Sequence, residues 1–258
     1  MAGNRGALLL SDSPTWRSAL QGYSIDIYFP SAGSIPFIFR HSPPILNKNT
    51  IQAAMQKIYY ERNLPHWHPP GAAFFLTYRL YGSIPQSKLF ELQRNFASET
   101  LQLRSRLSGQ TLDQATYALQ RRFFVHYDEH LDQNPNGPYW LKQPEIAHEV
   151  INSWSHLETY GVQIHALCIM PNHVHVLLQH REGGSSLSKI LQVHKAFTGK
   201  QCNRLLRRTG HFWQKETYDH WVRNAEEFDR IVRYILNNPV KAKLVERWED
   251  WPYTVFAQ

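Results

Sequence analysis

Cysteines and long apolar runs are both scarce in this chain of 258 residues. Cys168 and Cys202 are its two cysteines and do not form a CxxC pair, so neither a disulfide framework nor a cysteine zinc site is expected, and a reducing compartment fits. The apolar residues 7–10 are too few for a secretory signal, and no stretch approaches the roughly 20 residues that cross a membrane. We therefore expect a soluble, cytoplasmic protein with no membrane partner.

Acidic residues are also outnumbered, with 21 Asp and Glu against 28 Lys and Arg, which gives a formal charge of +7. This excess favours a polyanionic partner, most commonly nucleic acid, although a basic protein with another role has the same balance. Neither a Walker motif nor an HExxH sequence occurs, so ATP is not expected and a zinc hydrolase is a distant alternative.

Residues 1–60 contain many serines, prolines and isolated aromatics and keep no period for long, which predicts a poorly ordered N-terminal extension. Residues 61–258 are expected to form one folded domain, with a helical insertion at about 86–160. In the expected loop at 64–71, His66 and His68 precede two prolines, where no regular strand is expected. We interpret that pair as loop packing or, at most, a substrate contact.

Sequence periods predict the remaining elements. Strands are expected at 72–80, 163–170, 173–178 and 212–222, the middle two joined as a hairpin. Helices are expected at about 86–107, 111–132, 144–160, 187–208 and 225–238. The last helix is expected to begin at a capping box of Asn224 and Glu227 and to end before Pro239. This order predicts an antiparallel α+β sandwich.

The second strand of the hairpin holds the first candidate site. Its period of two places Val174, Val176 and Leu178 toward a core. His173 and His175 then project together from the opposite face, where two neutral imidazoles can hold one metal ion. On spacing alone, a pair of histidines with no metal, on a half-exposed sheet face, is a better interpretation than a metal site, because fourteen histidines make chance pairs common.

The last expected helix holds the second candidate site. It carries an apolar stripe at helical spacing, formed by Phe228, Ile231, Val232 and Ile235. Tyr234 and Asn238 are four residues apart, so they lie on one side of the helix beside that stripe. An isolated tyrosine in this place is more often a core-edge aromatic, and an asparagine before proline is often a terminator. The spacing permits a nucleophile one turn from a metal ligand.

Four segments together resemble a known family. Residues 170–178, which read MPNHVHVLL, resemble the HUH motif (histidine, hydrophobic, histidine) of the single-tyrosine transposases. Residues 212–214 (FWQ), 218–220 (YDH) and 234–242 (YILNNPVKA) follow at spacings similar to those in that family. Residues 64–80 and 137–141 resemble its longer branch, the REP-associated tyrosine transposases. The likeness covers about residues 60–254.

The resemblance implies a role for each candidate residue. His173 and His175 would be metal ligands, and Tyr234 the nucleophile. Asn238 stands where the wider family often has glutamine as a third ligand, and an amide oxygen suits Mg²⁺ or Mn²⁺. Tyr218 is a rival nucleophile, but its predicted strand offers no ligand partner four residues on.

The resemblance also implies a fold and a substrate. The fold would be a ferredoxin-like antiparallel sheet with helices on one face and the C-terminal tyrosine helix laid across the histidines. The activity would be cleavage and rejoining of single-stranded or hairpin, REP-like DNA through a 5′-phosphotyrosine, by a monomer or a homodimer. Alternatives are a relaxase or rolling-circle initiator with the same chemistry, or a hairpin-binding protein that has lost cleavage.

The basic helix expected at 187–208 is a candidate for phosphate contacts. It carries six cations with no acidic residue between them: Lys189, Lys195, Lys200, Arg204, Arg207 and Arg208. A solvated helix surface is the alternative. Trp67, Trp213 and Trp221 could stack on unpaired bases, although core packing is the commoner fate of tryptophan.

Overall fold

The computed structural model describes residues 59–61, 65–67, 71–134, 136–181 and 183–256. The expected N-terminal extension lies outside these residues, apart from Tyr59 and Tyr60, and the division into domains stays a prediction. Tyr59–Glu61 (β1) and Pro65–Trp67 (β2) form a two-stranded antiparallel sheet. The expectation that no regular strand would include His66 is therefore wrong, because β1 supplies the pairing partner.

The main sheet has five strands in the order β6-β3-β5-β4-β7, and every neighbouring pair is antiparallel. The strands are Ala73–Leu80 (β3), Val162–Ile169 (β4), His173–His180 (β5), Trp213–Trp221 (β6) and Thr254–Phe256 (β7). The first four follow the ferredoxin-like order, in which a crossover joins β3 to the parallel strand β4 on the far side of β5. The expected α+β class is confirmed, and β7 is an addition at the edge.

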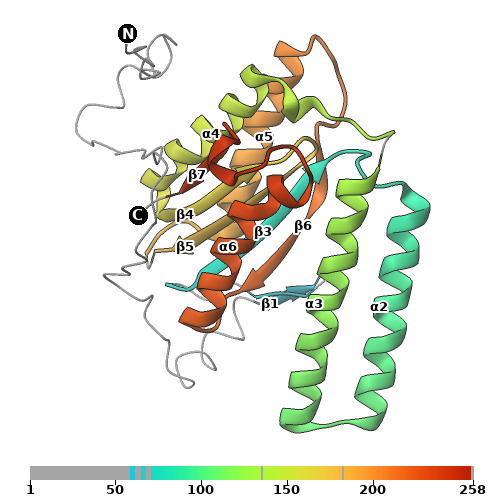
Figure 1. Cartoon of the computed structure of the whole chain (residues 1–258). Coiled ribbons are helices and arrows are strands. Elements are labelled where there is room, and N and C mark those ends of the chain that lie inside the picture. The colour runs from blue at the N-terminus through green and yellow to red at the C-terminus, as the bar shows by residue number, and fades with distance from the viewer. Residues whose placement is uncertain (1–58, 62–64, 68–70, 135, 182, 257–258) are drawn as a thin grey trace.

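Helices contact both faces of this sheet (Figure 1). Pro144–Leu157 (α4) and Leu187–Leu205 (α5) cover one face, where they bury one side of β3 and of β5 in the larger core. Val174, Val176 and Leu178 belong to that core, so the expected alternation along β5 is confirmed. Ala225–Lys241 (α6) lies across the other face, and its apolar stripe packs there as expected. The expected arrangement, with helices on one face of the sheet and the C-terminal helix across the histidines, is therefore found in α4, α5 and α6.

A long helical hairpin stands beside the sheet (Figure 1). It consists of Gln86–Arg106 (α2) and Gly109–Gln133 (α3), close to the expected bounds. A small core joins the two helices to the loop after β3, formed by Ile84, Leu89, Phe123, Tyr127 and Leu131. Phe124 of α3 belongs instead to the core under α6, so the second half of α3 reaches the histidine face of the sheet.

The C-terminal end of α6 differs from the expectation. The helix begins as expected, because Asn224 Oδ1 accepts a 2.8 Å hydrogen bond from the Glu227 N–H. It does not end at Asn238 but continues through Pro239 to Lys241. Proline removes one helical hydrogen bond, but the turn that follows is closed by an N–H from Leu244 to the Pro239 carbonyl at 2.9 Å. The helix therefore ends two residues after Pro239.

Short 3-10 helices complete the chain at Trp140–Lys142, Glu158–Tyr160 and Trp248–Asp250. No helix among the described residues is both long and apolar enough to span a membrane.

Candidate active site

The two histidines of β5 are part of the core. His173 is 1% exposed and His175 is fully buried, because α6 and the second half of α3 cover this face of the sheet. The His175 ring stacks on Phe75, with centroids 5.7 Å apart and an interplanar angle of 22°. The expectation that the imidazoles would stand outside the core is therefore wrong, although their shared face is as expected.

Each imidazole is held through its Nδ1 atom. His173 Nδ1 lies 2.6 Å from Asn172 Oδ1, which can only accept, so this nitrogen carries the proton and Nε2 carries a lone pair. His175 Nδ1 lies 2.7 Å from the Thr77 hydroxyl. Burial and the neighbouring His175 lower the pKa of His173 to about 3. His173 is therefore neutral at physiological pH, which is the state that binds metals.

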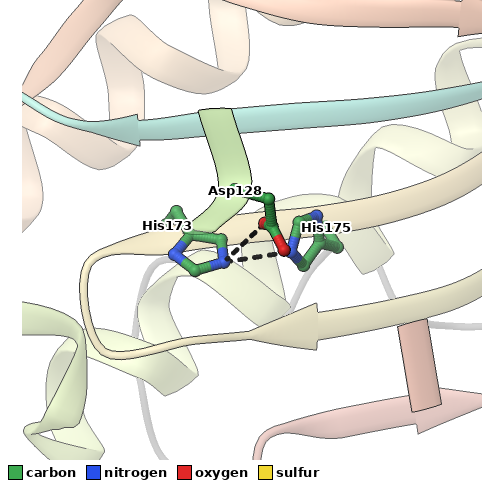
Figure 2. Close-up of side chains that lie close together, drawn as sticks. All are labelled: Asp128, His173 and His175. Carbon is green, nitrogen blue, oxygen red and sulfur yellow. Dashed lines mark hydrogen bonds and ion pairs between the residues drawn. The ribbon is translucent and has the colours of Figure 1, made fainter. Parts of the chain in front are cut away.

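A third group, the Asp128 carboxylate of α3, meets the two histidines (Figure 2). Asp128 Oδ1 lies 3.3 Å from His175 Nε2 and 3.7 Å from His173 Nε2, and the side chain is buried. Sequence analysis missed this residue. A signal existed, because Asp128 follows Phe124 by four residues and precedes Leu131 by three, which places a carboxylate on the buried side of α3.

These three groups fit a divalent cation. The two Nε2 atoms are 3.0 Å apart, and two ligands at right angles around a metal with bonds of about 2.1 Å would be separated by roughly the same distance. Because His173 Nε2 carries a lone pair, the 3.0 Å contact is a hydrogen bond donated by His175 Nε2, and a divalent cation could take the place of that proton between the two nitrogens and Asp128. Asp128, His173 and His175 therefore form a group that can hold a metal ion.

Asn238 supplies a buried amide beside Tyr234. It lies one turn after Tyr234 on α6 and is 1% exposed. Within the described part of the chain, neither its amide nitrogen nor its amide oxygen has a hydrogen-bond partner. A buried amide without partners costs free energy of about 1–3 kcal/mol, so this one is suited to a ligand that the chain does not itself provide.

Tyr234 of α6 lies against the histidines. Its ring centroid is 5.5 Å from that of His175, and its phenol donates a hydrogen bond to Asp128 Oδ2. Burial, followed by the negative charge of Asp128, raises the pKa of the Tyr234 phenol well above its usual range. The phenol is therefore protonated in this state, and its oxygen is held at a defined place beside the histidines.

Lys241, at the end of α6, partly balances the charge of Asp128. Its ammonium lies 2.9 Å from Asp128 Oδ2 and 3.2 Å from Asp132 Oδ2. Burial alone would raise the pKa of Asp128, but its contact with His175 and the neighbouring His173 and Lys241 hold that pKa well below its usual range. Asp128 is therefore a carboxylate anion inside the core.

Tyr218, the rival nucleophile, faces the same side of the sheet at a greater distance. It pairs with Thr77 on β3, and Thr77 pairs with His175 on β5. Tyr218 is thus two strands from His175, or roughly 10 Å at ordinary strand spacing. Its ring packs against Phe124 at 4.5 Å, and burial raises the pKa of its phenol. The structure brings Tyr234, rather than Tyr218, to the histidines.

The basic helix lies on the opposite face of the sheet. Of its cations, Lys189, Lys200, Arg204 and Arg207 are exposed. Lys195 instead makes hydrogen bonds within the protein, because its ammonium donates to three carbonyls of β6 and to Thr217 Oγ1 at 2.7 Å. Arg208 packs over the Trp140 ring at 3.8 Å. The helix and the histidines are therefore separated by the sheet itself.

The tryptophans singled out for stacking have different surroundings. Trp213 is 7% exposed and belongs to the larger core, where its indole N–H donates to Thr198. Trp221 is half-buried beside the same core. The side chain of Trp67 lies outside the described side chains. Trp213 is thus a packing residue.

Comparison with known proteins finds similarity to transposases over part of the chain. Residues 142–238 match the family of IS200-like transposases. Over 108 residues, or 38% of this chain, the sequence is 33% identical to a Haemophilus influenzae protein described as a REP-associated tyrosine transposase. Over 95 residues, or 36% of the chain, it is 30% identical to the REP-associated tyrosine transposase of Escherichia coli. The matches span 61% and 54% of the lengths of these two relatives.

A solved structure, that of a REP-associated tyrosine transposase bound to a REP hairpin, shares 19% identity over 76% of this chain and 80% of its own, with a TM-score of 0.44. A likeness at this level says nothing of which side chains correspond. The sequence matches carry more weight, and residues 142–238 include both histidines, Tyr234 and Asn238. Residues 142–238 of this chain thus match the family of IS200-like transposases, and the chain is similar in sequence to REP-associated tyrosine transposases over part of their length.

Proposed function

We propose that this protein cuts and rejoins single-stranded or hairpin, REP-like DNA by forming a 5′-phosphotyrosine on Tyr234. The observation that carries the proposal is the meeting of the Tyr234 phenol with the buried side chains of His173 and His175. The phenol is held by a hydrogen bond, and its ring lies 5.5 Å from that of His175. A nucleophile and a group of metal-binding side chains in one place suit phosphodiester chemistry.

The chain's own residues would act as follows. The Tyr234 oxygen attacks the phosphorus, a bond from tyrosine to the 5′-phosphate forms, and the bond to the 3′ oxygen breaks. The phenolic proton leaves along the hydrogen bond to Asp128 Oδ2, and a proton is returned to the 3′ oxygen, so the charge of the phosphodiester is unchanged. Rejoining reverses these steps, because the phosphotyrosine retains the energy of the broken bond.

His173, His175 and Asn238 would hold Mg²⁺ or Mn²⁺. When bound, such a cation polarises the scissile phosphate and offsets its charge. Asn172 and Thr77 orient the two imidazoles through Nδ1, so that both Nε2 atoms face the same point. The unpartnered amide of Asn238 is suited to complete the set through its oxygen.

The direct test is formation of a covalent protein–DNA adduct. The protein is incubated with labelled hairpin DNA that carries single-stranded flanks, in Mg²⁺, Mn²⁺ or EDTA, and separated on a denaturing gel. We expect a labelled band at the protein's mass in either metal and none in EDTA. If no hairpin or single-stranded DNA gives an adduct, a non-catalytic hairpin-binding protein becomes the better assignment.

We also propose that the exposed cations of α5 and of the turn that follows it contact DNA phosphates. Changing Lys200, Arg204 and Arg207 together to glutamine should weaken binding and flatten its salt dependence. In a plot of the logarithm of the binding constant against the logarithm of the salt concentration, each lost phosphate contact should reduce the slope by roughly 0.7 to 0.9. The measurement is the dissociation constant for hairpin DNA at several salt concentrations.

A matched set lies on the histidine side of the sheet. Arg121, Arg223 and Arg230 are exposed around Tyr117, with the Arg223 guanidinium 4.2 Å from that ring's centroid. Changing these three arginines to glutamine should leave the slope near that of the wild type. If the variant with these three arginines changed has the flatter slope, and the variant of the α5 cations does not, the phosphate contacts lie on the histidine side of the sheet.

A further inference from the structure

We propose that Asp128, supplied by the α2–α3 hairpin, is a further ligand of the same cation and also the residue that positions Tyr234. The inference rests on the proposed function and deepens it, because it assigns part of the site to a helix outside residues 142–238, the segment that matches the family. The hairpin would then be a working part of the site.

The two carboxylate oxygens of Asp128 have separate surroundings. Oδ1 faces both histidines, at 3.3 Å from His175 Nε2 and 3.7 Å from His173 Nε2. It is buried, and no described residue satisfies it with a well-formed hydrogen bond. Oδ2 accepts hydrogen bonds from the Tyr234 phenol and the Lys241 ammonium. One oxygen is thus available to a cation while the other holds the nucleophile.

The charge of the site favours a cation at this point. Among the described residues that meet here, Asp128 brings a buried carboxyl group, the two histidines bring imidazoles, and Lys241 is the ammonium that contacts the carboxyl group. Lys241 is about half exposed and is shared with Asp132. A buried carboxylate is costly unless it is paired, and burial of metal ligands is ordinary when the metal supplies the countercharge. A divalent ion beside Oδ1 would supply it.

The position of Asp128 is built into the fold. Its neighbour Tyr127 accepts a 2.9 Å hydrogen bond from Arg79 Nε of β3. Three residues on, the Leu131 carbonyl accepts a 2.8 Å hydrogen bond from the Asn172 side chain. The same Asn172 holds His173 through its other amide atom. Helix α3 is therefore anchored to the sheet on both sides of Asp128, and one asparagine links it to a candidate ligand.

The test is Mn²⁺ binding by Asp128→Asn, which keeps the shape of the side chain and removes its charge. Mn²⁺ affinity is measured without DNA, from the free-ion signal in electron paramagnetic resonance. We expect at least a tenfold loss for Asp128→Asn, because even an outer-shell partner is worth about 10–100-fold. Asp132→Asn is the matched control, since Asp132 also contacts Lys241, and it should bind Mn²⁺ nearly as the wild type does.

The positioning role has its own readout. Asp128→Asn should slow adduct formation at saturating Mn²⁺ while leaving the dissociation constant for hairpin DNA unchanged. Should Asp128→Asn fail to fold, Lys241→Met serves instead. It leaves Asp128 in place and removes a competing positive charge, so we expect it to bind Mn²⁺ several-fold more tightly than the wild type.

The possible failures are distinguishable. A wild-type protein that binds no Mn²⁺ and forms no adduct would overturn the proposed function. A wild-type protein that does both, with Asp128→Asn matching it in Mn²⁺ affinity and adduct rate, would overturn the inference alone. For Lys241→Met, unchanged or weaker Mn²⁺ binding would likewise count against Asp128 as a ligand.

Discussion

Replacing Tyr234 by phenylalanine is expected to abolish the covalent protein–DNA adduct while the protein folds and binds hairpin DNA as before. The change removes one oxygen and keeps the ring, which packs against Phe75, Phe124 and His175. It also removes one hydrogen bond to Asp128, at a cost to stability of about 1 kcal/mol. The nucleophile disappears and the core remains. The measurement is a denaturing gel with labelled DNA, alongside thermal unfolding and DNA binding.

Tyr218→Phe is the matched control. Tyr218 is the other tyrosine of this face that packs against Phe75 and Phe124, and it lies two strands from His175. This variant should still form the adduct. If instead Tyr218→Phe loses the adduct and Tyr234→Phe retains it, the nucleophile lies on β6 and the assignment to α6 is wrong, although the reaction class stands.

Changing either histidine of β5 to glutamine is expected to eliminate metal-dependent cleavage and the rise in melting temperature that Mn²⁺ gives the wild type. His173 and His175 would each lose the ring nitrogen that faces the other and Asp128. Alanine is a poor choice because both side chains are buried, and truncation beside Phe75 would open a cavity that costs a few kcal/mol. Glutamine keeps most of the volume. The melting temperature is measured with and without Mn²⁺ for each protein, so the baseline stability cancels.

His165→Gln tests whether any histidine of this sheet would give the same result. His165 lies on β4 with its ring 5.0 Å from Phe228 of α6, away from the group that can hold a metal. This variant should cleave DNA and respond to Mn²⁺ as the wild type does. A His175→Gln protein that is folded and still cleaves at the wild-type rate in Mn²⁺ would contradict the assignment of β5 to the metal site.

Local periodicity was enough to predict much of this protein. A period of two placed His173 and His175 on one face of β5, and a period near 3.6 placed Tyr234 beside the buried stripe of α6. The Asn224 cap was also readable, because capping involves residues three positions apart. Each of these features depends on neighbours along the chain, so the sequence by itself determined them. The extent of α6 was predicted less well, since Pro239 is tolerated one turn from its end.

Tertiary structure decided what covers each face. The histidines looked half-exposed in the sequence, but α6 and the second half of α3 bury them. The same packing brings Asp128, which lies 45 residues before His173 in the chain, within 3.7 Å of it, and places the basic helix α5 across the sheet. These outcomes depend on which elements pack together. Which elements pack together is set by the burial of apolar faces that lie far apart in the sequence. A periodic pattern shows that a face is apolar, but it does not show which element covers that face.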